Sequence, residues 1–400
     1  MNEIVMKTNI EQAEEVLAQT YSRFPVVFAK GSGCKLWDSE GKEYLDFVAG
    51  IAVCNLGHAH PAVAEAISQQ AKNLIHVSNL FYTVPQIKLA KWLTDNSFAD
   101  RAFFCNSGAE ANEAAIKLAR KYFFDKGNNN KNTIISAKQS FHGRTYASMS
   151  ATGQDKIKKG FEPMLPGFKM VPFNDIEALK ENLDSTVCAV MLEPIQGEGG
   201  VCCPSEDYLK QVKQLCVEND ILLIFDEVQT GIARTGKLFA YEHFDVKPDI
   251  MTLAKALANG LPVGAMLTTD KIAKAFGHGA HATTFGGTPL VASAALSVLE
   301  YIESNDLVNQ CDNVGNYFKE QLISLKEKYS FIKEVRGYGL LLGMPMSIKG
   351  APIVNKCLEK GFVINCIQDT ILRFIPPLII QKEEIDKLIN CLDEIFKEIT

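Results

Sequence analysis

Side chains that could carry out chemistry follow four short apolar runs, each with the composition of a β-strand. The stretch LLIFDEVQTG is the clearest case, because four residues typical of a buried strand run directly into Asp226 and Glu227. Polar residues that follow buried strands of an open parallel sheet meet at the edge where ligands bind. The four strand ends carry Ser107-Gly108-Ala109, Phe141 with Arg144, Asp226, and Lys255.

The turn after RAFFCN suggests an anion site. Ser107, Gly108 and Ala109 lead into the helix-patterned segment EANEAAIKLARKYFF. A small-residue turn at a helix N-terminus presents free amide donors and a partial positive charge, which suits a phosphate group. A purely structural alternative remains open at this point, in which Ser107 is an N-cap.

Lys255 and Asp226 supply opposite charges at two further strand ends. Burying a carboxylate at a strand end costs free energy unless a cation compensates its charge. As an alternative to a ligand-binding role, Asp226 or Glu227 could form an ion pair with an internal lysine or arginine. Lys255 lies between Ala254 and Ala256 after an apolar strand, where burial would depress the pKa of its amine and favour a nucleophilic role.

The third strand end combines a flat ring with a cation. Phe141 comes just after a predicted strand, Gly143 allows a close approach, and Arg144 adds a fork-shaped cation that matches a carboxylate. Taken alone, a Phe-His pair is more often explained by core packing. A phosphate cradle, an aromatic face, a deep carboxylate and a desolvated lysine together indicate pyridoxal phosphate, whose aldehyde forms a Schiff base with lysine and whose ring nitrogen must stay protonated. Asp226 would pair with that nitrogen.

The elements that position these residues follow from the hydrophobic pattern. Between about residues 100 and 270, short apolar runs alternate with longer helical segments, which predicts βαβ units and a mostly parallel sheet. After about residue 290, a helix, several short strands and a charged amphipathic helix predict a smaller α+β domain. We therefore expect an N-terminal segment, 1–50, that joins the small domain, a large cofactor-binding domain, 51–290, and a small domain, 291–400.

Composition excludes several classes of function. The chain has 400 residues, 47% of them hydrophobic and 22% charged, with a net charge of -6 and no basic stripe, so we expect no nucleic-acid partner. The N-terminus lacks a long apolar stretch, which predicts neither a signal peptide nor a membrane helix. Eleven cysteines without paired spacing predict no metal site and a reducing, cytoplasmic location.

Eight stretches, in order, resemble the class III (ornithine-type) aminotransferases of the fold-type I pyridoxal phosphate enzymes. They are YLDFVAGIAVCNLGHAHPAV, NSGAEANEAAIKLAR, FHGRT, EPIQGEGG, DEVQTGIARTG, LAKALANGLPVGA, TTFGGTPL and LRFIPPL. The resemblance covers nearly the whole chain. VSNLFYT, SATGQDKIKKGFEPMLPGF and GEGG are most similar to members that act on N-acetylornithine.

The resemblance implies roles at the cofactor. Lys255 would be the Schiff-base lysine and proton shuttle, Asp226 would hold the pyridinium, Gln229 would reach the ring hydroxyl, and Phe141 would stack on the ring. Ser107, Gly108 and Ala109 would hold the phosphate, joined by Thr284 from the other subunit of a homodimer with shared active sites. The family usually has Asn where this chain has Thr288, which leaves the details of that subunit contact open.

The resemblance also implies two substrate-binding arginines. Arg144 would bind the α-carboxylate of acetylornithine and Arg373 that of glutamate, with Glu198 as a gate that pairs with Arg373 when glutamate is absent. The composition supports this independently, because only seven of the 41 basic residues are arginine, so arginines here look chosen for bidentate carboxylate recognition.

The implied reaction is ping-pong transfer of the terminal amine of N2-acetylornithine to 2-oxoglutarate, giving N-acetylglutamate 5-semialdehyde and glutamate, as in arginine biosynthesis. Alternative substrates are succinylornithine, ornithine, 4-aminobutyrate and succinyl-diaminopimelate. An aminomutase on the same scaffold is disfavoured, because a mutase has no second amino acid to admit and would not need Glu198 beside Arg373.

Overall fold

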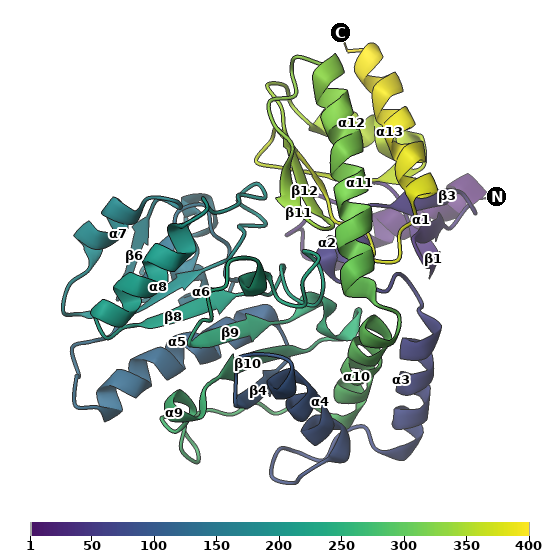
Figure 1. Cartoon of the computed structure of the whole chain (residues 1–400). Coiled ribbons are helices and arrows are strands. Elements are labelled where there is room, and N and C mark those ends of the chain that lie inside the picture. Colours follow the sequence, from purple (N-terminus) through teal and green to yellow (C-terminus); the bar gives the residue numbers. More distant parts are fainter. Residues whose placement is uncertain (1, 400) are drawn as a thin grey trace.

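The computed structural model describes residues 2–399, and a seven-stranded sheet lies at the centre of the larger part of the molecule (Figure 1). Only β10 runs antiparallel to its neighbours, and the other described pairs of this sheet are parallel. The α/β fold with a mostly parallel sheet is therefore confirmed. In spatial order, the strands are β4 (Arg101–Cys105), β10 (Gly264–Thr268), β9 (Ile250–Leu253), β8 (Leu222–Asp226), β7 (Val187–Leu192), β5 (Thr133–Ala137) and β6 (Phe168–Val171).

The strand sequences explain why this sheet is central. All residues of β5, β7, β8, β9 and β10 are buried, as expected for strands covered on both faces. Alternate residues serve the two faces: Leu222 and Ile224 pack in the hydrophobic cluster under α5 (Gly108–Asp125), whereas Leu223 and Phe225 pack in the larger cluster on the other side. Asp226 ends β8 at the carboxyl edge.

Two smaller four-stranded sheets complete the fold. The first comprises β1 (Phe28–Ser32), β2 (Lys35–Asp38), β3 (Glu43–Asp46) and β13 (Phe362–Val363), and the second β11 (Arg336–Tyr338), β12 (Leu341–Pro345), β15 (Ile371–Phe374) and β14 (Asn365–Ile367). β2 and β3 form the antiparallel hairpin expected for KLWDSEGKEYLDF. β3 pairs in parallel with β13, so the N-terminal strands are completed by a strand from the C-terminal part of the chain. The domain limits at residues 50 and 290 stay a prediction.

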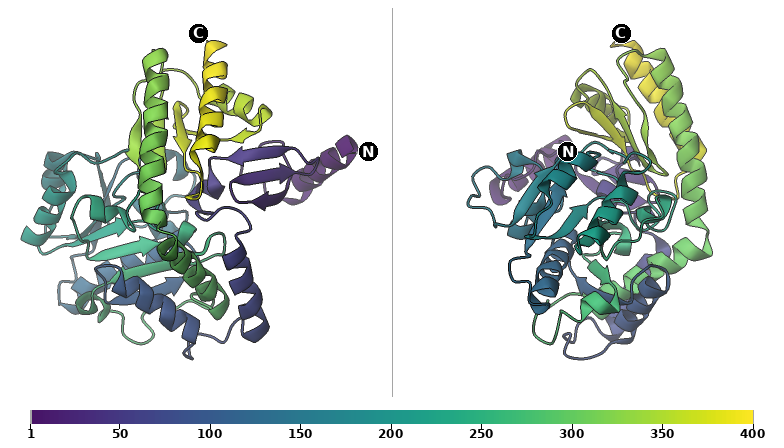
Figure 2. Two further views of the ribbon diagram at one scale, coloured as in Figure 1. Left: turned by 45° about the vertical axis from the view of Figure 1, so that its right-hand side comes forward. Right: turned by 60° about the vertical axis from the view of Figure 1, so that its left-hand side comes forward.

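The helices cover these sheets and link the two parts. The long α11 (Leu307–Lys328) extends from beside the central sheet into the C-terminal part, where it contacts α13 (Lys382–Lys397) (Figures 1 and 2). Within residues 2–399, no helix has both the length and the apolarity needed to cross a membrane. The helices not yet named are α1 (Asn2–Val16), α2 (Ala49–Ala52), α3 (Pro61–Asn73), α4 (Val84–Asp95), α6 (Tyr146–Ala151), α7 (Ile176–Asn182), α8 (Tyr208–Glu218), α9 (Asp270–Ala273), α10 (Pro289–Ser304) and α12 (Ala351–Glu359), with 3-10 helices η1 (Asp155–Ile157), η2 (Ala240–His243) and η3 (Lys255–Ala258).

Candidate active site

A cleft of about 410 Å³ opens at the carboxyl edge of the central sheet. All four sequence-predicted strand ends contribute to its wall. The cleft is lined by Ser107, Gly108 and Ala109, by Phe141 and Arg144, by Asp226 and Gln229, by Lys255, and by Glu198. The structure therefore brings together nine of the eleven residues predicted for the site.

Asp226 is the buried carboxylate of the cleft, with 3% of its surface exposed. Its Oδ2 accepts hydrogen bonds from Asn112 Nδ2 at 2.7 Å and from His142 Nδ1 at 2.8 Å, and its Oδ1 accepts one from the Val228 amide at 3.0 Å. These donors offset much of the cost of burying the charge. The internal lysine or arginine partner of the structural alternative is not among the residues that contact Asp226 within the described chain.

The neighbouring Glu227 points away from the cleft, because successive side chains of an extended chain alternate. Its Oε2 accepts from the Ala240 amide at 2.7 Å and from Thr230 Oγ1 at 2.9 Å, while its Oε1 accepts from the Tyr241 amide at 2.8 Å. Burial raises the pKa of Glu227 to about 7 despite these donors. Glu227 therefore anchors the start of η2, which is a structural role.

Helix α5 begins at the cleft. Ser107 is its N-cap, and Ser107 Oγ accepts from the Glu110 amide at 3.2 Å, so the capping interpretation is correct. The cap leaves other first-turn amides without helical acceptors beside the cleft. A Cβ on Gly108 would lie 2.7 Å from Val228 Cγ1, so a glycine lets the helix approach the β8 end closely. This helix start can hold an anion as well as being capped.

Lys255 directly follows β9 and Ala254, with a positive φ of 41°. Burial lowers the pKa of its amine, the Glu198 carboxylate raises it, and the Arg373 guanidinium lowers it again, with a net downward shift. Among the described residues, none hydrogen-bonds the Lys255 side chain. A lowered pKa and the lack of a hydrogen-bond partner in the described chain suit this amine to act as a base or nucleophile inside the cleft.

Phe141 is half-buried in the cleft wall, and its amide donates to Glu193 Oε2 at 3.1 Å. Gly143 has a φ of 136°, and a Cβ there would lie 2.8 Å from the Ala109 Cβ, so this loop must pass close to the start of α5. Arg144 is exposed, with its guanidinium carbon 5.8 Å from the Phe141 ring centroid. It can bind an incoming carboxylate.

Arg373 and Glu198 form an ion pair with 2.6 Å between Nη1 and Oε1. Arg373 has 1% of its side chain exposed, whereas Glu198 keeps 27%. Burial alone would raise the pKa of Glu198, but the Arg373 charge, with smaller contributions from Lys255 and Gln229, lowers it to about 2. Arg373 does not line the cleft itself and is reached past Glu198.

Gln229 completes this pair. Its Oε1 accepts from Arg373 Nη1 at 3.1 Å and its Nε2 donates to Glu198 Oε1 at 3.1 Å. The resemblance implied that Gln229 contacts the ring hydroxyl of the cofactor; in this structure its amide joins the two charged residues. It still lines the cleft, so that role stays a prediction.

Thr284 is the predicted residue that lies apart from the cleft of its own chain. It is exposed, on a loop beside Phe285, which is 62% exposed. Asn106 and Asn79 hold the same loop through Thr283. Its role at the site of another subunit stays a prediction.

Asn112 was not predicted from the sequence, whereas Glu193 was expected to flank the site, in a role that structural hydrogen bonding explains as well as chemistry does. Asn112 is buried and binds Asp226, and Glu193 is buried and accepts from the Phe141 and Gly197 amides. Burial raises the pKa of Glu193 to about 7. The available signals were an amide on the apolar face of α5 and a carboxylate directly after β7.

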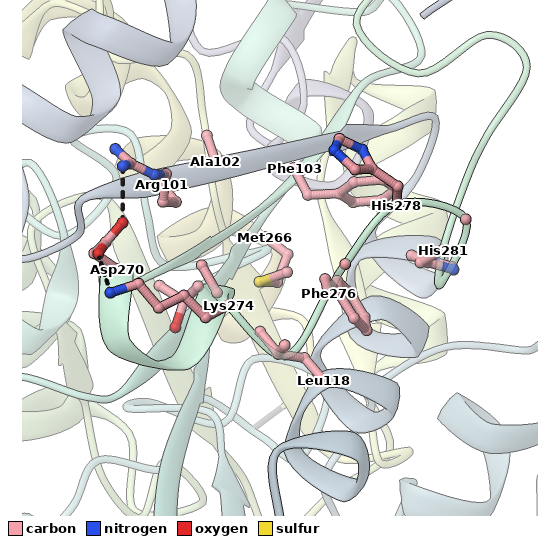
Figure 3. A pocket seen from close by; sticks show the side chains of 14 residues that line it. Arg101, Ala102, Phe103, Leu118, Met266, Asp270, Lys274, Phe276, His278 and His281 are labelled. Carbon is pink, nitrogen blue, oxygen red and sulfur yellow. Dashed lines mark ion pairs between the residues drawn. The ribbon is translucent and has the colours of Figure 1, made fainter. Parts of the chain in front are cut away.

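A second cavity, of about 470 Å³, lies near the opposite end of β4 and β10 (Figure 3). Its charged residues already neutralise one another, because Asp270 pairs with Arg101 at 2.7 Å and with Lys274 at 3.1 Å. All three are well exposed, and the rest of the wall is largely aromatic and apolar. It lacks the buried carboxylate and desolvated amine of the cleft.

The chain belongs to the class-III aminotransferases, whose family model matches residues 16–396. An acetylornithine aminotransferase of Methanocaldococcus jannaschii is 56% identical over 381 residues, covering 95% of this chain and 96% of that protein. One of Caldanaerobacter subterraneus subsp. tengcongensis is 52% identical, with 98% and 99% covered. The crystal structure of the ornithine aminotransferase of Toxoplasma gondii superimposes with a TM-score of 0.95 at 34% identity, covering 98% and 95%.

The cofactor of this enzyme is pyridoxal phosphate. The residues present fit it: the α5 start can hold an anion, Phe141 offers a ring face, Asp226 offers a carboxylate, and Lys255 offers an amine without a hydrogen-bond partner among the described residues, all in one cleft. The resemblance in sequence, the fold-type I architecture and the aminotransferase class are all confirmed.

Proposed function

We propose that this enzyme transfers the terminal amino group of N2-acetylornithine to 2-oxoglutarate, producing N-acetylglutamate 5-semialdehyde and glutamate for arginine biosynthesis. The observation that carries the proposal is the pair of arginines around one cleft: Arg144 is open, and Arg373 is closed by Glu198 at 2.6 Å. The similar proteins named acetylornithine aminotransferase, 45–56% identical, support the same substrate.

When bound, pyridoxal phosphate would supply an aldehyde that reacts with amines and a ring that withdraws electrons. Lys255 would hold the cofactor and move the proton of the substrate carbon, because burial lowers the pKa of its amine and so makes the amine easier to deprotonate. Asp226 would pair with the ring nitrogen, and Phe141 would stack on one face of the ring. Ser107, Gly108 and Ala109 bind the phosphate.

The two arginines divide the substrates. Arg144 binds the distant α-carboxylate of acetylornithine while Arg373 is occupied by Glu198. When glutamate or 2-oxoglutarate enters, its own carboxylate replaces Glu198 on Arg373. A single cleft can therefore alternate between an amine remote from its carboxylate and an amine next to one.

A homodimer completes the site through Thr284 of the partner subunit. Two observations support it: Thr284 lies outside the cleft of its own chain, and the segment before and within α4 exposes large apolar side chains. Leu80 is 86% exposed, Phe81 63%, Tyr82 94% and Val84 63%. Contiguous exposed apolar residues mark an interaction surface. We place the enzyme in the cytoplasm, where its many free thiols stay reduced.

A panel of ω-amines at fixed 2-oxoglutarate tests the substrate. The kcat/KM for N2-acetylornithine should exceed those for succinylornithine, ornithine, 4-aminobutyrate and succinyl-diaminopimelate. A higher value for ornithine would move the assignment to the activity of the structurally similar Toxoplasma enzyme. A higher value for another amine would equally replace acetylornithine.

A further inference from the structure

The Asn112 side chain is the most completely bonded amide at the cleft. Its Nδ2 donates to Asp226 Oδ2 at 2.7 Å and to the His142 carbonyl at 2.7 Å, and its Oδ1 accepts from Thr252 Oγ1 at 2.7 Å. All four residues are buried. Since the Asp226 carboxylate and the His142 carbonyl can only accept, Nδ2 must face them, and the orientation of the amide is fixed.

The bonds of Asn112 join the elements that carry the cofactor-binding residues. Asn112 itself lies in α5, in the turn after Ser107, Gly108 and Ala109. Thr252 lies in β9, three residues before Lys255, and His142 follows Phe141. Asp226 ends β8.

Asn112 also determines how Asp226 is used. With Oδ2 occupied by Asn112 and His142, and Oδ1 accepting from the Val228 amide, the carboxylate is held in one rotamer. Hydrogen bonds to a charged acceptor are the strong ones, and donors that bind the ionised form favour it. A second lone pair of Oδ1 remains for a cation in the cleft.

We propose that Asn112, itself oriented by Thr252, is the positioning residue that holds Asp226 toward the cofactor ring and fixes its distance from the phosphate-binding start of α5. This inference rests on the proposed cofactor roles of Asp226 and Ser107 to Ala109. It assigns no bond-making step to Asn112. It predicts that removing the amide weakens cofactor binding both at Asp226 and at the start of α5.

Asn112→Ala is the first test, measured on refolding-competent apoenzyme titrated with pyridoxal phosphate. Loss of a hydrogen bond to a charged group predicts a Kd for the cofactor about ten- to a hundredfold higher. The pH profile of the bound cofactor's visible absorbance should shift, and kcat should fall more than the KM values change. An unchanged Kd, within twofold, together with an unmoved pH profile would overturn the proposal.

Thr252→Val keeps the test decisive if Asn112→Ala does not fold. The matched control is Thr268→Val, because Thr268 is also a buried strand threonine, whose hydroxyl donates to the Asp249 carbonyl at 2.8 Å at the other end of the sheet. Thr252→Val should raise the cofactor Kd severalfold and shift the pH profile, whereas Thr268→Val should leave both unchanged. Equal behaviour of the two valine variants would reject the role of Thr252.

The wild-type enzyme separates the two hypotheses. If it fails to bind pyridoxal phosphate, the proposed function fails. If it binds the cofactor and turns over acetylornithine while Asn112→Ala and Thr252→Val behave like wild type, the proposed function stands and this inference fails.

Discussion

Replacing Glu198 by Gln removes the charge that closes Arg373 while keeping the size of the side chain. The Arg373 contact lowers the pKa of Glu198 from 4.5 to about 2, which corresponds to about 3 kcal/mol at 1.36 kcal/mol per unit. A carboxylate whose pKa is lowered on folding stabilises the folded state when the pH is above its pKa in the unfolded chain. That contribution is present above pH 4.5 and is lost as the pH falls toward 2.

The energy of the Glu198–Arg373 ion pair also opposes the binding of glutamate, because the glutamate carboxylate must displace Glu198 before it reaches Arg373. Acetylornithine, bound through Arg144, meets no such competition. Glu198→Gln should therefore raise kcat/KM for glutamate relative to kcat/KM for acetylornithine by at least about tenfold. The ceiling is near a hundredfold, because the ion pair contributes about 3 kcal/mol and each 1.4 kcal/mol changes the ratio about tenfold. The free energy of unfolding at pH 7 should also fall, because a buried guanidinium loses its counter-charge.

Each half-reaction should be followed separately by single-turnover absorbance, so that the two amino donors are compared without their partner substrate. Asp270→Asn is the matched control, because it removes a carboxylate from an arginine pair of nearly equal length, 2.7 Å, that is exposed (Figure 3). That variant should change stability by no more than about 1 kcal/mol and leave the substrate ratio unchanged. Equal effects of Glu198→Gln on both donors would refute the gate.

Lys255→Ala should abolish turnover and the visible absorbance of the lysine-bound cofactor; a purified variant that retains that absorbance would contradict the role of the lysine. Asp226→Ala should remove most turnover, measured as kcat, and normal activity would reject its pairing with the ring nitrogen. Arg144→Lys should raise the KM for acetylornithine about tenfold or more, because the bidentate fork is lost, with a smaller effect on glutamate; equal changes in the two KM values would argue against separate carboxylate sites. Burial raises the pKa of Glu227 from 4.5 to about 7, so its contribution to the free energy of unfolding is fully present below pH 4.5 and is lost as the pH rises through 7. The stability advantage of wild type over Glu227→Gln should therefore shrink by up to about 3 kcal/mol between pH 5 and pH 8. If chemical denaturation gave the same difference at both pH values, this role of Glu227 would be contradicted.

The strand ends could be predicted because a parallel sheet brings the carboxyl end of each apolar run to one edge. Asp226 ends such a run, and Ser107, Phe141 and Lys255 each lie within four residues after one, so local composition was enough. The antiparallel direction of β10 could not be predicted in the same way, because its apolar sequence is equally suited to either direction.

Contacts between residues that are far apart in the chain could not be predicted from the sequence. Asn112 meets Asp226 across 114 positions and Thr252 across 140, and a helical asparagine gives no sign of its partner. Gln229 shows the same limit: its place after β8 was predictable, but its bonds to Arg373 and Glu198 depend on how the C-terminal sheet packs on the cleft. The family resemblance supplied Thr284 and Arg373, which periodicity alone does not indicate.

The parallel pairing of β3 with β13 affects the order in which the protein can be completed during synthesis. Leu45 pairs with Phe362, so the inner edge of the first hairpin has no strand beside it until nearly the whole chain has left the ribosome. At about 5 to 20 residues per second, that edge waits for roughly 15 s to a minute. Premature termination anywhere before residue 362 would leave the same edge permanently open to pairing with other chains.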